Sequence, residues 1–332
     1  MTREPSTISK KRMFSGMQVT GKSHIGNYFG AIKQFVEMQD SNYDVIAFVA
    51  NLHSLTTVSD AQNLKDNTID LVKDYLACGL DPKKMILFLQ SDILEHTELT
   101  WIFDCLVTVP FMERAHSYKD KVANNIEPTM GLFNYPVLMA ADMLLYSPDV
   151  VPTGQDQKQH IEYARDIAQK FNNAFGGTFK LPEEYIKKEV AIVPGIDGRK
   201  MSKSYKNHIP LFAGDEEIRK ICMSIVTDSL LPADKKNPDE SNIFNIYKVV
   251  ATEEETKLFK QKFEEGGVGY GDLKKELAER IITFVTPMRE KRDKITDEYV
   301  FEVLKDGAQK AKIIAEEKMK EVREKCGIIR NI

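Results

Sequence analysis

The chain has 332 residues, and its 42% hydrophobic content is enough to bury one large core and a second, smaller one. Its 46 Lys and Arg residues against 50 Asp and Glu residues give a formal charge of −4, which argues against a protein that binds nucleic acid over its whole surface. A contact with RNA therefore needs a local patch, and we expect no DNA partner.

The polar N-terminus and the absence of any run of about 18 apolar residues predict neither secretion nor a membrane partner. The four cysteines, Cys78, Cys105, Cys222 and Cys326, are too far apart for a CxxC pair and too few for a disulfide framework. We therefore expect ordinary thiols in a reducing cytoplasm. The sequence has no Asp-rich or His-rich cluster, so we predict no metal site held by the protein itself.

Short β-rich runs alternate with amphipathic helices in the first part of the chain. A strand-like run at 13–14 leads through a glycine-containing turn into an apolar-periodic segment at 28–38. Residues 45–50 form a buried-strand run, and Ser59 or Asp60 then caps a helix whose apolar positions follow the 3.6-residue period.

That helix ends at Gly79 and Pro82, and residues 85–89 form the next strand before another helix through Trp101 and Leu106. The order strand, helix, strand is a βαβ unit, which is typical of parallel sheets covered on both faces. We therefore predict an α/β fold with a Rossmann-like, doubly wound parallel sheet.

After about Pro210 the strand-like runs vanish and helical segments dominate, which predicts a second, all-helical domain. From Asp297 apolar residues recur at helical spacing among Lys and Glu, the pattern of one long amphipathic helix. We predict a Rossmann-like catalytic domain at 1–209, a helical domain at 210–296, and a C-terminal helix at 297–332 that packs back on the body.

Two segments suit nucleotide chemistry. The turn from Ser15 to Asn27 feeds a helix N-terminus, where backbone N–H groups and the helix dipole favour phosphate. The Gly-rich loop from Gly195 to Ser204 holds two lysines and could close over a triphosphate. Each is weak alone, because such turns are common connections, His24 by itself is more often structural, and charged Gly-rich loops are usually solvated.

Together, His-Ile-Gly-Asn at 24–27 and Lys-Met-Ser-Lys-Ser at 200–204 resemble the two signatures of the class I aminoacyl-tRNA synthetases. Nearly the whole chain, from Met13 to about Gly327, is similar to the bacterial-type tryptophanyl members. Further segments that look like theirs lie at 138–142, 151–160 and 226–229. The resemblance implies that L-tryptophan is activated with ATP, accompanied by Mg²⁺, and passed to the 3′-terminal adenosine of tRNA(Trp).

The resemblance also implies roles for single residues. It gives catalytic roles to Lys200, Lys203, Lys121, His24 and Asn27. It gives ATP contacts to Gln18, Val19, Thr20, Gly26, Asn27, Gly154, Gln155, Asp156, Ile192, Lys200, Met201, Ser202, Lys203 and Ser204. It gives tryptophan contacts to Phe14, Gly16, His53, Tyr135, Met139, Asp142, Val151 and Gln157. In the family, the helical domain reads the anticodon and one tRNA spans a homodimer, so we expect both here.

Asp142 makes chemical sense as a tryptophan contact, because it lies in the apolar segment 136–146, where a carboxylate needs a partner. The indole N–H is such a donor, and hydrogen bonds to a charged acceptor are the stronger kind. An isolated buried Asp more often pairs with Arg or caps a helix. His53 follows a strand, in the zone where α/β sheets bind ligands.

Three positions depart from the family pattern: Val19 stands where proline is customary, Asn51 where aspartate is common, and Lys206 where glycine often follows the lysine loop. Three other functions stay open. A tyrosyl-tRNA synthetase would share the fold, a related nucleotidyltransferase would not need the helical half, and a silent relative could bind tryptophan or RNA as a regulator. The intact Lys200, Lys203, His24 and Asn27 favour retained catalysis over the last of these.

Overall fold

A five-stranded parallel sheet organises the first part of the computed structural model. The structure describes residues 10–19, 21–58, 60–114, 129–152, 158–185 and 193–329. The strands are β1 (Lys11–Gln18), β2 (Tyr43–Ala50), β3 (Ile86–Leu89), β4 (Val150–Pro152) and β5 (Glu183–Tyr185). Their order in the sheet is β3-β2-β1-β4-β5, which reverses direction beside β1, and the predicted doubly wound sheet is confirmed.

The central strands β1 and β2 pair along their whole length, from Lys11 opposite Tyr43 to Gln18 opposite Ala50. Successive side chains of a strand point to opposite faces. Accordingly Met13 belongs to one apolar cluster and its neighbour Phe14 to the other, so each face of the sheet has its own core. The carboxyl ends of both strands therefore open at the same edge, where α/β sheets bind ligands.

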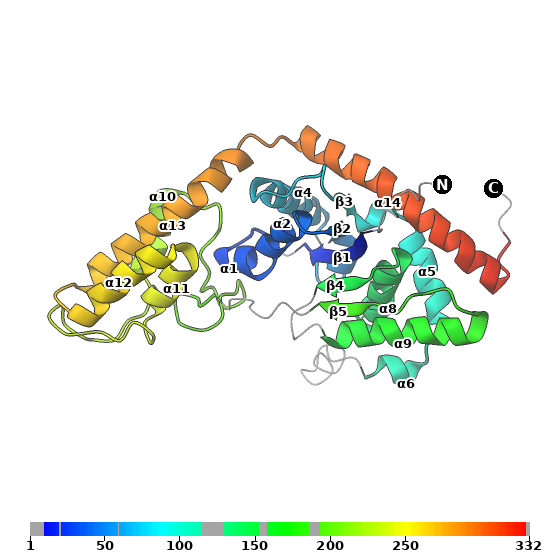
Figure 1. The fold of residues 1–332 in the computed structure, drawn as a ribbon, viewed down its shortest axis with the longest axis horizontal. Helices are drawn as coiled ribbons and strands as arrows, with labels where there is room; N and C mark the ends of the chain where they lie inside the picture. Colours follow the sequence, from blue (N-terminus) through cyan, green and yellow to red (C-terminus); the bar gives the residue numbers. More distant parts are fainter. Residues whose placement is uncertain are drawn as a thin grey trace, which may run out of the picture.

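Helices cover both faces of this sheet (Figure 1). They are α1 (Ile25–Asn27), α2 (Lys33–Gln39), α3 (Asn51–Ser54), α4 (Ala61–Ala77), α5 (Glu95–Asp104), α6 (Val109–Met112), α8 (Met130–Leu145) and α9 (Lys158–Phe175), with a π-helical turn at Tyr28–Ile32 and a 3₁₀ turn at Gln90–Asp92. Of the two predicted caps, Asp60 is the N-cap of α4, and its carboxylate accepts the Asn63 N–H at 2.7 Å. Gly79, at φ +112°, follows the helix as predicted.

The sequence predicted the wrong bounds for the first turn and for the helix that follows it. Residues 15–18, expected to begin the turn, belong to β1, because they pair in register with β2. The helix expected from Tyr28 starts earlier, at Ile25.

All regular elements that the structure describes after residue 210 are helices: α10 (Asp215–Met223), α11 (Asn242–Val250), α12 (Glu253–Glu265), α13 (Tyr270–Arg292) and α14 (Asp297–Cys326). In Figure 1 the helices α10 to α13 form an arm at one end of the molecule, and α14 runs back over the sheet part. The predicted all-helical second part is therefore present, while the exact divisions after residues 209 and 296 stay a prediction.

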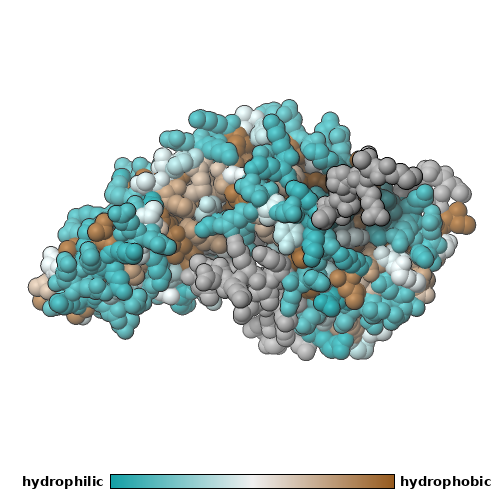
Figure 2. All heavy atoms as spheres, in the orientation of Figure 1, coloured by the Kyte–Doolittle hydropathy of each residue, from teal (hydrophilic) through white to brown (hydrophobic). Residues whose placement is uncertain are grey.

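The long helix α14 contacts β3, α4, α5 and α8. Near its C-terminus, the Arg323 guanidinium donates to both carboxylate oxygens of Glu98 at 2.7 and 2.5 Å. Figure 2 shows a mostly hydrophilic surface on this face, with smaller apolar areas. Among the described residues, no helix combines the length and apolar character needed to cross a membrane.

Candidate active site

The turn after β1 is closed by reciprocal hydrogen bonds between His24 and Asn27. His24 is the N-cap of α1: its Nδ1 accepts the Asn27 N–H at 3.2 Å, and Asn27 Oδ1 accepts the His24 N–H at 3.1 Å. Because Nδ1 is an acceptor, the ring proton of the neutral imidazole sits on Nε2. His24 therefore has a structural task as well as an N–H donor left for a ligand.

His24 is also kept neutral. Burial is the main cause that lowers its pKa, to about 4, and the nearby Lys203 and His208 add to the effect. At neutral pH the side chain is thus a hydrogen-bond donor without charge.

The lysine loop is a tight hairpin pinned by Asn207. The Gly195 N–H donates to the Arg199 carbonyl at 2.7 Å, and Gly198 has a φ of +83° that favours glycine. Asn207 is buried, accepts the Ser202 N–H on Oδ1 at 2.8 Å and donates from Nδ2 to the Lys200 carbonyl at 3.2 Å. Its amide therefore fixes the backbone on both sides of Met201.

The turn and the lysine loop meet in space, as their joint resemblance predicts. The Ile25 N–H donates to the Ile209 carbonyl at 3.0 Å, and the Leu211 N–H donates to the Ser23 carbonyl at 2.9 Å. The Gly26 N–H points at Met201 Sδ, 3.3 Å away, and a Cβ on Gly26 would lie 3.3 Å from Met201 Cβ. Glycine at 26 therefore permits the close approach of the two segments.

The two lysines of the loop lie in different surroundings. Lys200 is exposed. Lys203 is half-buried, and its Nζ would lie 3.9 Å from a Cβ placed on Gly21, so its ammonium sits beside the turn. Burial lowers the pKa of Lys203, and the nearby Asp74 carboxylate opposes that effect. Of the two, Lys203 is the lysine placed beside His24.

A second cluster surrounds Asp142, whose side chain is wholly buried. His96 Nδ1 donates to Oδ1 at 2.6 Å, His53 Nε2 donates to Oδ2 at 2.8 Å, and Gln90 Nε2 lies 2.8 and 2.9 Å from the two oxygens. Burial alone would raise the pKa of Asp142, but the interaction with His96 and the hydrogen bonds from both histidines lower it to about 2. The carboxylate is therefore ionised.

The orientation of Gln90 follows from its other partners. Its Oε1 accepts the backbone N–H groups of Leu52 at 3.1 Å and His53 at 3.4 Å. Those groups can only donate, so the amide nitrogen must face Asp142.

Aromatic rings form a wall beside this cluster. The ring of Phe14 stacks on Phe48 at 5.0 Å and on Tyr146 at 5.1 Å between centroids. A Cβ on Gly16 would lie only 2.2 Å from Phe48 Cε1, so this glycine is required by the neighbouring ring. Tyr135 meets His53 edge to face, with centroids 6.3 Å apart.

The remaining predicted residues are distributed as follows. Val151 is buried in the same apolar cluster as Phe14, and the half-buried Met139 packs against that cluster. Gln18 ends β1, and the Val19 N–H donates to Ser54 Oγ at 3.1 Å. Ser204 is exposed. Seven predicted site residues lie outside the described residues: Thr20, Lys121, Gly154, Gln155, Asp156, Gln157 and Ile192.

The sequence reasoning missed Gln90, His96 and Asn207. Gln90 directly follows β3, so the strand-end rule that singled out His53 could have found it. His96 and Asn207 carry no such signal, because their contacts depend on the folded chain.

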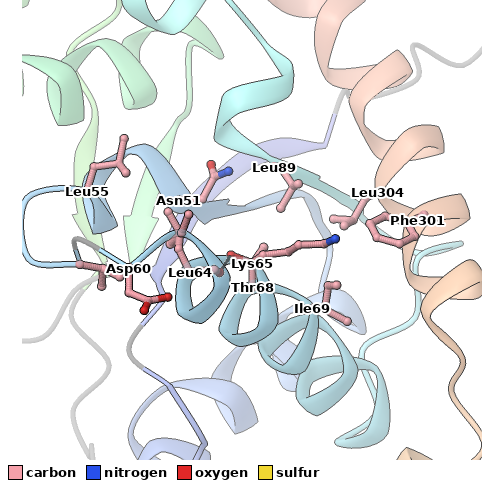
Figure 3. Close-up of a pocket in the computed structure, with 12 residues that line it drawn as sticks. Asn51, Leu55, Asp60, Leu64, Lys65, Thr68, Ile69, Leu89, Phe301 and Leu304 are labelled. Atoms are coloured by element: carbon pink, nitrogen blue, oxygen red, sulfur yellow. Dashed lines mark hydrogen bonds between the residues drawn. The ribbon is translucent and has the colours of Figure 1, made fainter.

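A separate cleft of about 390 Å³ lies between α3, α4, the end of β3 and α14 (Figure 3). It is lined by Asn51, Leu55, Val58, Asp60, Ala61, Leu64, Lys65, Thr68, Ile69, Leu89, Phe301 and Leu304. None of these was predicted to bind ATP or tryptophan, and most are apolar, so the cleft does not suit a triphosphate. Among the described residues, no group of three or more His, Cys, Asp or Glu side chains could hold a metal ion.

Comparison with known proteins identifies relatives of this chain. A family model described as "tRNA synthetases class I (W and Y)" matches residues 8–286. A tryptophan–tRNA ligase from Fusobacterium nucleatum is 51% identical over 325 residues, which cover 97% of this chain and 99% of the relative.

Two solved structures are similar over nearly the whole chain. A tryptophanyl-tRNA synthetase from Campylobacter jejuni, complexed with ADP and tryptophan, is 45% identical with a TM-score of 0.91, covering 95% of this chain and 99% of that one. The enzyme from Mycoplasma pneumoniae is 35% identical with a TM-score of 0.79, covering 96% and 98%.

Proposed function

The chain belongs to the class I tRNA synthetases of the tryptophan and tyrosine type, and from this membership we propose that it joins L-tryptophan to tRNA(Trp) with ATP. In the first step the tryptophan carboxylate attacks the α-phosphorus of ATP, and pyrophosphate leaves. In the second, a ribose hydroxyl of the terminal adenosine attacks the carbonyl carbon of the aminoacyl-adenylate, and AMP leaves. Positioning and charge stabilisation account for most of the catalysis.

One observation carries the proposal: the turn that holds His24 and Asn27 is hydrogen-bonded to the segment that follows the lysine loop. This brings a neutral N–H donor and the Lys203 ammonium together at the carboxyl end of β1. Such donors suit the triphosphate and the negative charge that grows on departing pyrophosphate. The Campylobacter relative binds ADP and tryptophan, which supports the same ligands here.

The roles of single residues in ATP binding are part of this proposal. Gln18, Val19, Gly26 and Asn27 line the nucleotide, and Lys200, Ser202 and Lys203 meet its phosphates, with Lys121 and the segment at 154–156 completing the site by resemblance. We propose that Mg²⁺ enters with ATP, bound to phosphate oxygens, which are the hard ligands it prefers.

Asp142 is the proposed acceptor of the indole N–H. Three side chains already donate to its carboxylate, so the indole must share Oδ2 with His53 or displace it. His53 is the natural one to move, because its side chain is 12% exposed whereas Gln90 and His96 are fully buried. Tryptophan therefore enters from the His53 side.

Asp142→Asn tests this pocket, since it keeps the shape of the side chain and removes the charge. We expect tryptophan to bind more weakly by about 1–3 kcal/mol, because the indole N–H loses a charged acceptor, with ATP binding little changed. If calorimetric titration gave a normal tryptophan affinity for this variant, Asp142 would have a structural role and would not bind the indole.

The experiment that tests the function is ATP–pyrophosphate exchange with each of the twenty amino acids. Exchange that depends on tryptophan alone is the expected result. A tyrosyl enzyme would respond to tyrosine, a nucleotidyltransferase for another acid to neither, and a silent regulator would bind tryptophan without exchange. The tryptophan-specific names of the high-identity relatives do not favour the tyrosyl alternative.

We propose that the helical part at 210–296 reads the anticodon and takes no part in adenylate formation. Lys235 and Lys257 are exposed there, and phosphate contacts dominate affinity for nucleic acid. Charge reversals such as Lys235→Glu and Lys257→Glu should spare pyrophosphate exchange and weaken tRNA charging at physiological salt. If a panel of such changes across this part left charging intact, the anticodon assignment would be wrong.

We propose that the protein is a homodimer, and that its interface includes exposed apolar side chains of α5, α6 and the start of α8. Leu94, Trp101, Val109 and Met130 are 75, 70, 61 and 76% exposed, and Trp is strongly favoured in interfaces. Trp101→Glu should shift the mass measured by sedimentation to that of a monomer. Leu258→Glu, on the helical arm, is the matched control that should leave it unchanged.

We propose the cytoplasm as the location, where tRNA charging supplies translation. The four cysteines are unpaired, as suits a reducing compartment.

A further inference from the structure

His96 occupies a position behind the proposed tryptophan contact that none of the assigned roles includes. It lies on α5 with its side chain fully buried. Its Nδ1 is 2.6 Å from Asp142 Oδ1, and its Nε2 is 3.0 Å from the Tyr146 hydroxyl. One imidazole thus joins the buried carboxylate to a buried phenol.

The chemistry of the partners fixes the protons of this chain. An ionised carboxylate is acceptor-only, so His96 Nδ1 must carry a hydrogen. Burial, together with the charges of Asp142 and Glu95, raises the pKa of Tyr146, so its hydroxyl keeps its proton and can either donate to or accept from His96 Nε2. The Asp142 carboxylate therefore fixes a hydrogen on His96 Nδ1, and the Tyr146 hydroxyl provides a partner for His96 Nε2.

The His96 ring has little freedom to turn away. Its centroid lies 5.6 Å from that of Tyr146 and 6.1 Å from those of Phe48 and Phe88, so three aromatic rings enclose it. Side chains in such a packed core sit in rotamer minima and have few voids to move into. The donor to Asp142 Oδ1 is therefore held in place, in contrast to the partly exposed His53 on Oδ2.

We propose that His96 is a positioning residue for tryptophan selection, which holds the Asp142 carboxylate in the orientation that accepts the indole N–H. The inference rests on the proposed function, because it presupposes that tryptophan binds beside Asp142. His96 itself touches no substrate. Its influence should therefore be felt only by ligands that offer Asp142 a donor.

This restriction gives a readout that general damage to the pocket would not produce. L-tryptophan and L-3-benzothienylalanine have nearly the same shape, but sulfur replaces the N–H in the second. Their dissociation constants are measured by calorimetry for the wild type and for His96→Leu. We expect His96→Leu to weaken tryptophan by about tenfold, about 1.4 kcal/mol, and the sulfur analogue by less than about twofold.

Two conservative variants make the test independent of the leucine variant's folding. His96→Asn places an amide N–H near the former Nδ1 and should restore most of the tryptophan affinity, whereas His96→Gln reaches toward the former Nε2 and should not. Equal loss for both ligands, or equal affinity of the Asn and Gln variants for tryptophan, would overturn the inference.

The failure of this inference is distinct from the failure of the proposed function. If the wild type neither binds tryptophan nor supports tryptophan-dependent exchange, the function itself is wrong. If the wild type does both and the tryptophan-to-analogue ratio is the same in His96→Leu, only the role of His96 is wrong.

Discussion

Val19 stands where the family resemblance leads us to expect proline, and its backbone N–H has a partner here. That N–H donates to Ser54 Oγ at 3.1 Å, and the Ser54 hydroxyl donates in turn to the Ala50 carbonyl at 3.1 Å. Both Val19 and Ser54 are buried. A proline has no N–H, so valine permits a hydrogen bond that ties the turn to α3 and that proline could not make.

Val19→Pro should therefore destabilise the protein, although proline also restricts the unfolded chain. The lost hydrogen bond costs about 0.5–1.5 kcal/mol and leaves a buried hydroxyl without its donor, which outweighs the roughly 0.4–1 kcal/mol gained from the unfolded state. Urea unfolding measures the net loss, which we expect to be about 1 kcal/mol. In a Ser54→Ala background the same change should cost less. An equal cost in both backgrounds would show that the hydrogen bond to Ser54 does not cause the loss.

The other two departures differ in how well they fit the backbone around them. Lys206 has a φ of +52°, a left-handed conformation that favours glycine, the residue that the family resemblance leads us to expect there. Asn51 donates from Nδ2 to Ser91 Oγ at 2.8 Å and accepts the Ser91 N–H at 3.1 Å. An aspartate could accept from both groups of Ser91, so the two residue types are interchangeable at this contact.

Replacing Lys203 should slow the chemical step of adenylate formation. Its proposed task is to meet charge that is largest in the transition state, so Lys203→Ala should lower kcat and kcat/KM for exchange alike, with KM for ATP nearly unchanged. Losing one such contact typically costs about 10²–10³-fold. Lys22→Ala, at an exposed lysine in the same turn, is the control. A rate of adenylate formation within about threefold of wild type would remove Lys203 from the mechanism.

At the scale of elements, the sequence predicted best those helices and strands that are long and have a regular hydrophobic period. The strand run at 45–50 and the helix expected after Ser59 or Asp60 are regular patterns, and the structure contains both, as β2 and α4. The strands β4 and β5 have three residues each, too short for alternation to be read. The second half of α8, from Pro136 on, is apolar and largely buried, so its sequence has no clear helical period to detect.

The candidate site divides in the same way. The turn and the lysine loop are continuous segments, so short motifs sufficed to find them. The Asp142 cluster is assembled from residues 46, 52 and 89 positions away, His96, Gln90 and His53. Only the packing of α5, α8 and the strand ends brings these side chains together, and a single sequence carries no record of that.

The position of Gly307 predicts that α14 packs in close contact with the edge of the sheet. A Cβ at this position would lie 1.8 Å from the Leu87 carbonyl oxygen of β3, so the helix backbone rests directly on the edge strand. Gly307→Ala should cost about 3 kcal/mol or more, because a rigid backbone atom cannot move aside as a side chain can. The change in unfolding free energy is measured with urea.

Gly271 provides the matched control, because it also lies in a helix, α13, and a Cβ there would meet no atom within 4 Å. Gly271→Ala should be neutral or stabilising by up to about 1 kcal/mol, since alanine is the better helix former. Similar costs for the two variants would show that α14 does not need close contact with β3.

At the scale of the whole molecule, one ion-pair cluster joins the helical arm to the sheet part. Arg292, at the C-terminus of α13, donates from Nε to Asp74 Oδ1 and from Nη2 to Asp70 Oδ1, both at 2.6 Å, and both aspartates lie on α4. Asp74 also accepts the Ser23 N–H at 3.4 Å, next to His24. The position of the arm and the geometry of the ATP turn therefore share one buried carboxylate.

Arg292→Met should make stability depend on pH. Burial raises the pKa of Asp74 above its unfolded value, while the bonds from Ser23 and Arg292 act in the opposite direction. When folding raises the pKa of an acid, the protein loses stability as the pH rises from the unfolded pKa to the folded pKa of that acid. Removing Arg292 raises the folded pKa of Asp74 further, so this pH range becomes wider. The cost of Arg292→Met should therefore be smallest at acid pH, where the variant's Asp74 is protonated, and should grow as the pH rises.

Breaking a buried pair typically costs about 3–5 kcal/mol, and because the Arg292 side chain is 22% exposed we expect about 2–3 kcal/mol at the higher pH. Urea unfolding at several pH values measures this, and Asp74→Asn in the same background should remove the pH dependence by removing the unpaired charge. Arg219→Met is the control: its pair with Glu279 is exposed at both side chains, so its loss should cost less than about 1 kcal/mol. A pH-independent cost for Arg292→Met would mean that Asp74 finds another cation or water when Arg292 is removed.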